Sequence, residues 1–292
     1  MASLAREGSA VLARAGIPTA ALDAEILLAH ILGVGRPHLH ARPEEPVRPE
    51  DARRYAELLT RRAARVPLQY LTGVQEFWSL PFHVTPAVLI PRPETELLVE
   101  AFVRLNQRPD PMVIDVGTGS GCLAIAVAHE APGALVHATD LSEEALGVAR
   151  LNASDNDVAG RIAFYHGDLL APLRGLGLEG RADFILSNPP YIAEADLPGL
   201  EPEVGRHEPR LSLTPGADPL LIHRRLAREA PPFLKPGGHL LVEIGRGQEE
   251  ALPGIYGATP APGAGRLEVI EVRPDLAGIP RLLVARRPPA AS

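Results

Sequence analysis

Apolar residues recur at helical spacing through the first quarter of the chain. The pattern predicts one helix around residues 4–15, a second over 21–32 and a third over 50–65. Prolines and glycines separate the three segments, as expected between short helices. Residues 1–75 are therefore predicted to form a small helical domain.

The pattern changes after this helical region. Between residues 76 and 90 aromatic and β-branched residues dominate, and Pro81 and Pro86 interrupt them. We interpret this stretch as a β-hairpin, within a linker that covers residues 76–92. Two prolines at its end then open a helix that continues to about Leu105.

From Pro111 onward, strand-like apolar runs alternate with helical patterns. Strands are expected at residues 112–116, 135–139, 162–165, 184–187, 239–244, 267–272 and 281–286. Helices are expected at 121–129, 142–156 and 220–234. This alternation is typical of an α/β fold, in which helices cover both faces of a mostly parallel, here seven-stranded, sheet. Residues 93–292 are predicted to form this domain, with the Gly- and Pro-rich stretch 260–265 as a surface loop.

Composition narrows the class of protein. The chain has 292 residues, 46% of them hydrophobic, which suits one large domain and one small one. Its single cysteine, Cys122, excludes a disulfide framework and a cysteine zinc site, and the ten histidines show no metal-ligand spacing. No metal site is expected.

Charge and hydropathy indicate where the protein acts. No targeting signal and no apolar run of about 18 residues occurs, so we expect a cytoplasmic protein without a membrane span. The formal net charge is −7 and no basic run stands out. That balance argues against a protein that binds nucleic-acid phosphates.

A glycine-rich turn follows the first strand of the predicted sheet. It reads Asp115-Val116-Gly117-Thr118-Gly119-Ser120-Gly121 and opens a helix. Glycine lets a backbone turn tightly and approach a ligand closely. The spacing of the three glycines differs from that of the dinucleotide-binding fingerprint, and the turn lacks the lysine of a P-loop. A merely structural turn is the alternative, but we predict that Asp115 and residues Gly117, Thr118, Gly119, Ser120 and Gly121 bind a cofactor.

Two further acids follow the next two strands. Asp140 ends the second strand, where a carboxylate can accept hydrogen bonds from ribose hydroxyls, with Leu141 beside it. Asp168 follows the third strand and could hold an adenine amino group, with Leu169 against the ring. Each acid alone would be a turn residue or a helix cap. Together they predict S-adenosylmethionine bound between the glycine turn and Asp140.

A proline-stiffened tetrapeptide, Asn188-Pro189-Pro190-Tyr191, follows the fourth strand. The two prolines remove backbone donors and fix φ, which leaves the carbonyls of Asn188 and Pro189 rigidly aimed. The Asn188 side chain adds an acceptor and Tyr191 adds an aromatic face. This arrangement suits a planar NH2 group that is held in line with a methyl donor. An ordinary stiffened loop is the alternative.

These motifs resemble the release factor glutamine methyltransferase family, called PrmC or HemK, over nearly the whole chain. The similarity includes Leu22–Leu28, Pro67–Gly73, Val88–Glu96 with its Pro-Arg-Pro-Glu-Thr-Glu run, the glycine turn, the tetrapeptide and Val242–Gly245. It implies a Rossmann-like class I S-adenosylmethionine-dependent methyltransferase fold. It also implies methylation of the glutamine side-chain amide in the Gly-Gly-Gln motif of class I peptide chain release factors, with S-adenosylhomocysteine as product. A monomer without direct nucleic-acid contact is expected.

Other functions remain open from the residues themselves. A DNA or RNA amino-methyltransferase would use the same tetrapeptide on a base, and a scaffold without activity could retain the cofactor site. A nicotinamide dehydrogenase fits poorly, because the glycine spacing is wrong and Lys235 is the sole lysine.

Six further residues have structural and functional interpretations. Trp78 is interpreted as a packing anchor between domains, and His207-Glu208 as a solvated loop. Arg92 and Glu94 are expected either to pair with each other or to contact the cofactor. Phe82, in the linker, could line the cofactor mouth.

Overall fold

The chain forms two compact units in the computed structural model, which describes residues 1–258 and 266–289. The first unit combines Met1–Val74 with Leu200–His207. The second contains Gln75–Gly199 and the chain from Glu208 onward. The predicted surface loop at 260–265 lies outside the described residues.

The first unit is helical. Its helices are α1 (Ala2–Arg14), α2 (Ala20–Leu32), α3 (Arg36–Ala41), α4 (Pro49–Ala63), α5 (Leu68–Thr72) and α9 (Pro202–His207). The helical periodicity correctly predicted α1, α2 and α4. The short helices α3, α5 and α9 were not expected, because five or six residues carry too little periodicity to recognise. Gly33 ends α2 with a φ of 65°, a left-handed conformation that favours glycine.

An ion-pair chain joins α9 to the other helices of this unit. Arg62 of α4 donates from Nε to Asp23 Oδ2 and from Nη1 to Glu203 Oε1, each at 2.8 Å. Arg65 Nη2 lies 2.8 Å from Glu203 Oε2. Asp23 and Arg62 are buried, so their charges are compensated almost entirely by each other and by Glu203.

The second unit is built on a seven-stranded sheet. Its strands are β3 (Met112–Val116), β4 (Leu135–Asp140), β5 (Ile162–His166), β6 (Ala182–Ser187), β7 (Leu234–Glu243), β8 (Glu268–Pro274) and β9 (Pro280–Arg286). They lie in the order β5-β4-β3-β6-β7-β9-β8. Only β9 runs antiparallel to its neighbours, β7 and β8. The predicted mostly parallel α/β sheet is confirmed.

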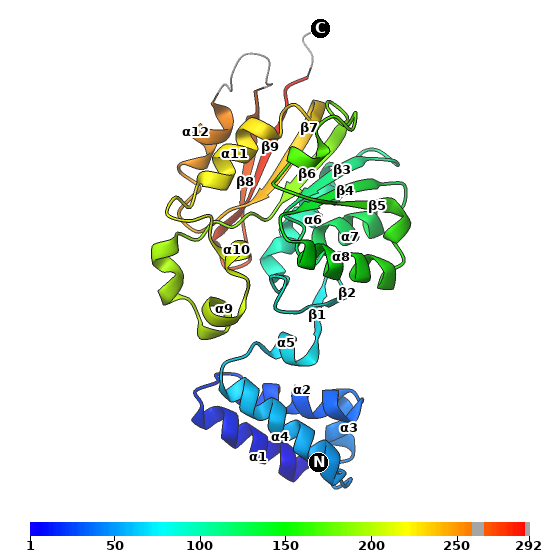
Figure 1. The fold of residues 1–292 in the computed structure, drawn as a ribbon, viewed down its shortest axis with the longest axis vertical. Helices are drawn as coiled ribbons and strands as arrows, with labels where there is room; N and C mark the ends of the chain where they lie inside the picture. The colour runs from blue at the N-terminus through cyan, green and yellow to red at the C-terminus, as the bar shows by residue number, and fades with distance from the viewer. Residues whose placement is uncertain (259–265, 290–292) are drawn as a thin grey trace. The chain divides into compact units, whose positions relative to one another are not determined.

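Helices cover both faces of this sheet (Figure 1). They are α6 (Glu96–Leu105), α7 (Cys122–Glu130), α8 (Glu143–Asp155), α11 (Leu221–Glu229) and α12 (Leu252–Gly257). A further short helix, α10 (Arg210–Leu213), precedes α11. Alternate strand residues face opposite ways: Val113 and Leu186 join the core under α6 and α7, whereas Ile114 and Ile185 join the core under α11 and α12. The predicted helix over 220–234 is too long, because α11 ends at Glu229 and β7 already begins at Leu234.

A short hairpin, β1 (Val74–Phe77) and β2 (Leu80–His83), precedes the sheet. Trp78 and Ser79 form its two-residue turn with φ of 54° and 58°. Phe82 and Trp78 both pack against the core of the second unit. Phe82 is fully buried in the core of the second unit rather than at the cofactor mouth. Trp78 packs against that same core and donates to Glu130, so it anchors the hairpin within one unit.

No helix among the described residues is both long and apolar enough to cross a membrane.

Candidate active site

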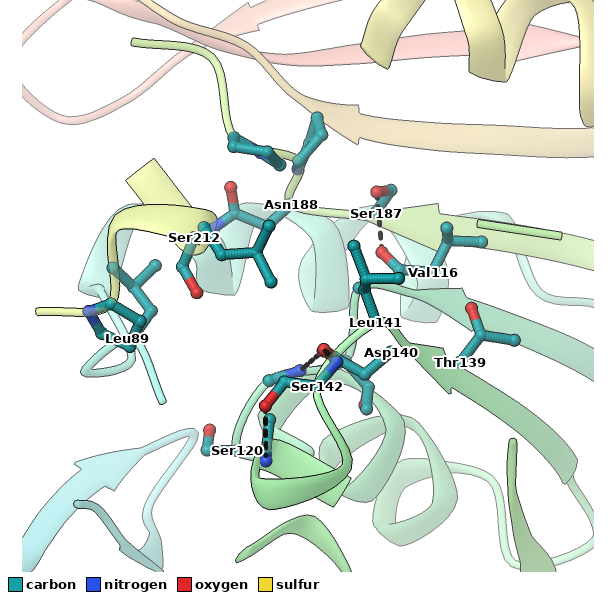
Figure 2. Close-up of a pocket in the computed structure, with 18 of the residues that line it drawn as sticks. Leu89, Val116, Ser120, Thr139, Asp140, Leu141, Ser142, Ser187, Asn188 and Ser212 are labelled. Atoms are coloured by element: carbon teal, nitrogen blue, oxygen red, sulfur yellow. Dashed lines mark hydrogen bonds between the residues drawn. The ribbon is translucent and has the colours of Figure 1, made fainter. Parts of the chain in front are cut away.

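A pocket of about 280 Å³ opens where the order of strands reverses. The chain passes from β3 to β4 and β5 on one side and then returns to β6 on the other side of β3. Ligands of open α/β sheets bind at the carboxyl ends of strands at such a point. Residues from the ends of β3, β4, β5 and β6 all line the pocket. The Ser187 hydroxyl donates to the Val116 carbonyl at 2.8 Å and joins two of these ends (Figure 2).

The glycine turn forms one wall of the pocket. Gly117 and Gly119 have φ of 74° and 56°, and a Cβ at either position would meet no atom within 4 Å. Gly121 is different: its Cβ would lie 3.0–3.3 Å from Ile125 and Ala149. Gly117, Thr118, Gly119 and Ser120 line the pocket but Gly121 does not. The third glycine therefore permits helix packing, while the first two leave open space for a ligand.

Asp115 lies beneath this turn and does not line the pocket. Its Oδ2 accepts from the Thr118 hydroxyl at 2.6 Å and from the Ala124 backbone N–H at 3.2 Å, which caps α7. Its Oδ1 is buried without a partner among the described residues. Burial raises the pKa of Asp115 to about 7, and the two donors oppose that shift.

Asp140 and Leu141 line the pocket opposite Asn188 (Figure 2). The carboxylate of Asp140 accepts the Gly119 N–H at 2.8 Å on Oδ2 and the Ser142 N–H at 2.9 Å on Oδ1. Each oxygen keeps a second lone pair for a ligand hydroxyl. Burial raises the pKa of Asp140, and the backbone donors oppose this.

Asp168 and Leu169 also line the pocket. The Arg225 guanidinium binds both carboxylate oxygens of Asp168, at 3.0 and 2.8 Å, so an adenine amino group would have to share this acceptor. Leu169 has a φ of 47°, a left-handed conformation that costs energy for a residue with a Cβ. Backbone strain at the pocket wall is a signal that sequence cannot show.

The tetrapeptide follows β6, and Asn188, Pro189 and Pro190 line the pocket. Asn188 Nδ2 donates to Thr95 Oγ1 at 3.1 Å, and its Oδ1 accepts no hydrogen bond from the described residues. Tyr191 does not line the pocket; its hydroxyl donates to Glu243 Oε1 at 3.1 Å. A Cβ on Gly245 would come within 2.9 Å of the Tyr191 ring, so glycine is needed there.

The Pro-Arg-Pro-Glu-Thr-Glu run contributes residues that the sequence did not assign. Arg92 lines the pocket and donates from Nη2 to both oxygens of Glu208, at 2.6 and 2.8 Å. The expected pairing with Glu94 is therefore wrong, and so is the interpretation of Glu208 as part of a solvated loop, because its side chain is buried. Thr95 lines the pocket and donates to Glu243 Oε2 at 2.6 Å.

No group of three or more His, Cys, Asp or Glu side chains that could hold a metal ion occurs within residues 1–258 and 266–289.

Comparison with known proteins agrees with this geometry. The chain matches the PrmC N-terminal domain over residues 3–73 and the Methyltransferase small domain over residues 93–198. A release factor glutamine methyltransferase of Moorella thermoacetica is 48% identical, with 94% of each chain covered. The chain belongs to the release factor glutamine methyltransferase family. A further family member, from Cereibacter sphaeroides, is 44% identical over 96% of this chain and 95% of its own.

Solved structures of lower sequence identity share the fold of this chain. A methyltransferase from Pyrococcus furiosus has a TM-score of 0.52 and 18% identity, covering 78% of this chain and 99% of its own. The hMettl16 catalytic domain, solved with an RNA hairpin, has a TM-score of 0.54 and 16% identity, covering 84% of each chain. The methyltransferase fold expected from the motifs is thus confirmed.

Proposed function

We propose that this protein transfers a methyl group from S-adenosylmethionine to the side-chain amide nitrogen of the glutamine in the Gly-Gly-Gln motif of class I release factors. The observation that carries this proposal is the amide oxygen of Asn188, which lines the pocket without a donor of its own. Such an acceptor suits an incoming NH2 group. The family relatives named as release factor glutamine methyltransferases support the protein substrate.

The residues present fit the methyl donor. Gly117 and Gly119 leave space for it, and Asp140 offers free lone pairs to a ribose. Asp115 lies beneath the turn and holds the hydroxyl of Thr118, which lines the pocket. Leu141, Asp168 and Leu169 lie where the nucleoside is expected. When bound, S-adenosylmethionine supplies a methyl group on a positively charged sulfur that is a good leaving group.

The tetrapeptide acts by positioning. An amide nitrogen is a weak nucleophile because its lone pair is delocalised, so acceptors that hold both its hydrogens favour the reactive orientation. Asn188 Oδ1 and the Pro189 carbonyl are the acceptors we assign to this role. The methylated nitrogen loses one proton to water, so no titrating base is required in the chemical step.

We infer that the helical unit recognises the release factor. One glutamine side chain offers little surface for specificity, and a second domain provides more. We place this protein in the cytoplasm as a monomer, and its net charge of −7 supports the expectation that it does not contact nucleic acid directly.

Mass spectrometry of a release factor incubated with enzyme and labelled S-adenosylmethionine tests the proposal. We expect one methyl group on the glutamine of Gly-Gly-Gln and none on a release factor carrying Gln→Glu at that position, which has no nitrogen to hold. Labelling of duplex DNA or ribosomal RNA, with the release factor left unmodified, would instead assign the protein to the nucleic-acid amino-methyltransferases.

Substitution of Asn188 tests the catalytic assignment. Asn188→Ala should leave cofactor affinity within about threefold but lower turnover at least about 100-fold, because a transition-state positioning contact is lost. Asn188→Asp retains an acceptor and should keep part of the activity. Steady-state kinetics with a release factor checks both, and wild-type turnover in Asn188→Ala would exclude the role.

A further inference from the structure

Four side chains from separate parts of the second unit form one hydrogen-bond network. The Glu243 carboxylate lies at the end of β7 with 2% of its surface exposed. It accepts the Thr95 hydroxyl on Oε2 at 2.6 Å and the Tyr191 hydroxyl on Oε1 at 3.1 Å. Thr95 Oγ1 in turn accepts Asn188 Nδ2 at 3.1 Å. The network therefore connects a buried charge to the tetrapeptide.

The chemistry of these groups fixes the direction of every bond. An ionised carboxylate can only accept, so the single proton of the Thr95 hydroxyl points to Glu243. The oxygen of Thr95 then has only lone pairs left, and it can bond only to the NH2 end of the Asn188 amide. The oxygen of that amide must point the other way.

The direction of these bonds depends on an ionised Glu243. Burial raises the pKa of Glu243, and the hydroxyls of Thr95 and Tyr191 and the charge of Arg281 oppose that shift. In this geometry each carboxyl oxygen accepts one hydroxyl, as an ionised carboxylate does. A neutral group that can donate, such as a glutamine side chain, would remove this constraint and allow the chain of bonds to reverse.

We propose that Thr95 and Glu243 are positioning residues that orient the Asn188 amide, so that its oxygen faces the methyl acceptor and the site selects a carboxamide over a carboxylate. The inference rests on the proposed function, since it concerns the acceptor of that reaction. With the amide reversed, Asn188 would present an NH2 group. The same pocket would then favour glutamate, which accepts hydrogen bonds, over glutamine, which must donate them.

Three variants separate orientation from packing. Thr95→Ser keeps the hydroxyl, Thr95→Val removes it with little change of shape, and Glu243→Gln replaces an acceptor by a group that can also donate. Each is compared with the wild type for the affinity of two release factors, one with glutamine and one with glutamate in the Gly-Gly-Gln motif. Contacts remote from the pocket are the same for both release factors, so their contribution drops out of the ratio of the two affinities.

We expect the wild type and Thr95→Ser to prefer the glutamine form. In Thr95→Val and Glu243→Gln the ratio of the two affinities should fall about tenfold, which is the scale of one hydrogen bond. Turnover of the glutamine form should fall as well. Cofactor affinity should stay within about threefold in all three variants. An equal fall in both affinities, with the ratio unchanged, would reduce Thr95 and Glu243 to packing roles and overturn the proposal.

Nuclear magnetic resonance gives a readout that needs no activity. The sequence contains only four asparagines, so selective ¹⁵N-asparagine labelling yields four side-chain NH2 pairs, and Asn188→Ala identifies the relevant one. Its signals should shift and its exchange with water should accelerate in Thr95→Val but not in Thr95→Ser. Unchanged Asn188 signals in Thr95→Val would overturn the proposal.

The two arms also distinguish this inference from the proposed function. A wild-type enzyme that leaves the release factor unmethylated contradicts the proposed function. The NH2 signals of Asn188 then still decide whether Thr95 orients the amide.

Discussion

Asp140 lines the pocket, and Asp115 and Glu243 are buried carboxyl groups that hold residues of its wall, Thr118 and Thr95. None of them acts alone, because each already accepts hydrogen bonds from the chain: Asp115 caps α7, Asp140 holds the glycine turn, and Glu243 binds two hydroxyls. Each acid therefore shapes the site before any ligand binds. Substitutions at these positions test both the support that each acid gives to the chain and its effect on ligand binding.

Asp140→Ala should weaken S-adenosylmethionine binding by about 1–3 kcal/mol, the usual effect of stranding a hydrogen-bonding group. The variant loses the acceptor for the ribose and also the support for the Gly119 N–H. Calorimetric titration measures the loss. Asp110→Ala, at an exposed aspartate, is the matched control. Unchanged affinity in Asp140→Ala would rule out the ribose contact.

Asp115→Asn should change how stability depends on pH. The folded pKa of Asp115 is about 7, against an ordinary value of 3.8. Between these values the folded state binds a proton that the unfolded state does not, so this group makes the wild type more stable as pH falls. Above pH 7 both states are ionised and the burial penalty is fully present.

Asparagine at position 115 has no such titration. The free energy of unfolding of the wild type, relative to Asp115→Asn, should therefore rise by about 3 kcal/mol from about pH 8 to about pH 5. Denaturant titrations of the ligand-free proteins at both values check this, with Asp110→Asn as control. A pH-independent difference would show that Asp115 titrates near its ordinary value.

Four of the predicted glycines and acids line the pocket, and each lies at or just after the end of a strand: Gly117, Gly119, Asp140 and Asp168. Contacts between distant residues could not be predicted from sequence. Thr95 and Glu243 lie 148 residues apart, and Arg92 and Glu208 lie 116 apart. Spacing along the chain carries no information about such contacts, so the Pro-Arg-Pro-Glu-Thr-Glu run was recognised as a motif without a role.

At the scale of elements, long periodic segments were predictable and short ones were not. The bounds of β3 agree with the prediction at both ends, and α7 and α8 agree within one or two residues. The helix α9 was missed; it belongs to the helical unit, where Glu203 pairs with Arg62 and Arg65, residues far from it along the chain. The Asp23 of the Leu22–Leu28 motif belongs to the same ion-pair chain.

Arg62→Ala should destabilise the helical unit by about 3–5 kcal/mol, because the buried carboxylate of Asp23 would lose its partner. Hydrogen exchange of amides in α2 and α4 reports this locally, without assuming that both units unfold together. Arg61→Ala removes a neighbouring exposed arginine and should have little effect. Equal protection in the two variants would contradict the structural role of the ion pairs.

At the scale of the molecule, the chain forms two units and the second alone contains the pocket. Deleting residues 1–73 should therefore leave S-adenosylmethionine affinity within about threefold. Methylation of an intact release factor should be lost, since the surface proposed to recognise it is removed. Calorimetry and a methylation assay on the truncated protein measure the two quantities. Full activity after truncation would show that the helical unit is not required for recognition.

The position of β9 has a consequence for synthesis of the protein. The strand lies between β7 and β8, although it is the last of the three to emerge from the ribosome. A nascent chain that has not reached Arg286 leaves β7 with an open edge and β8 without any neighbour. Unpaired edges promote aggregation and recruit chaperones. The sheet beside the active site is thus completed only after β9 has been synthesised, so products terminated before Arg286 cannot accumulate as folded enzyme.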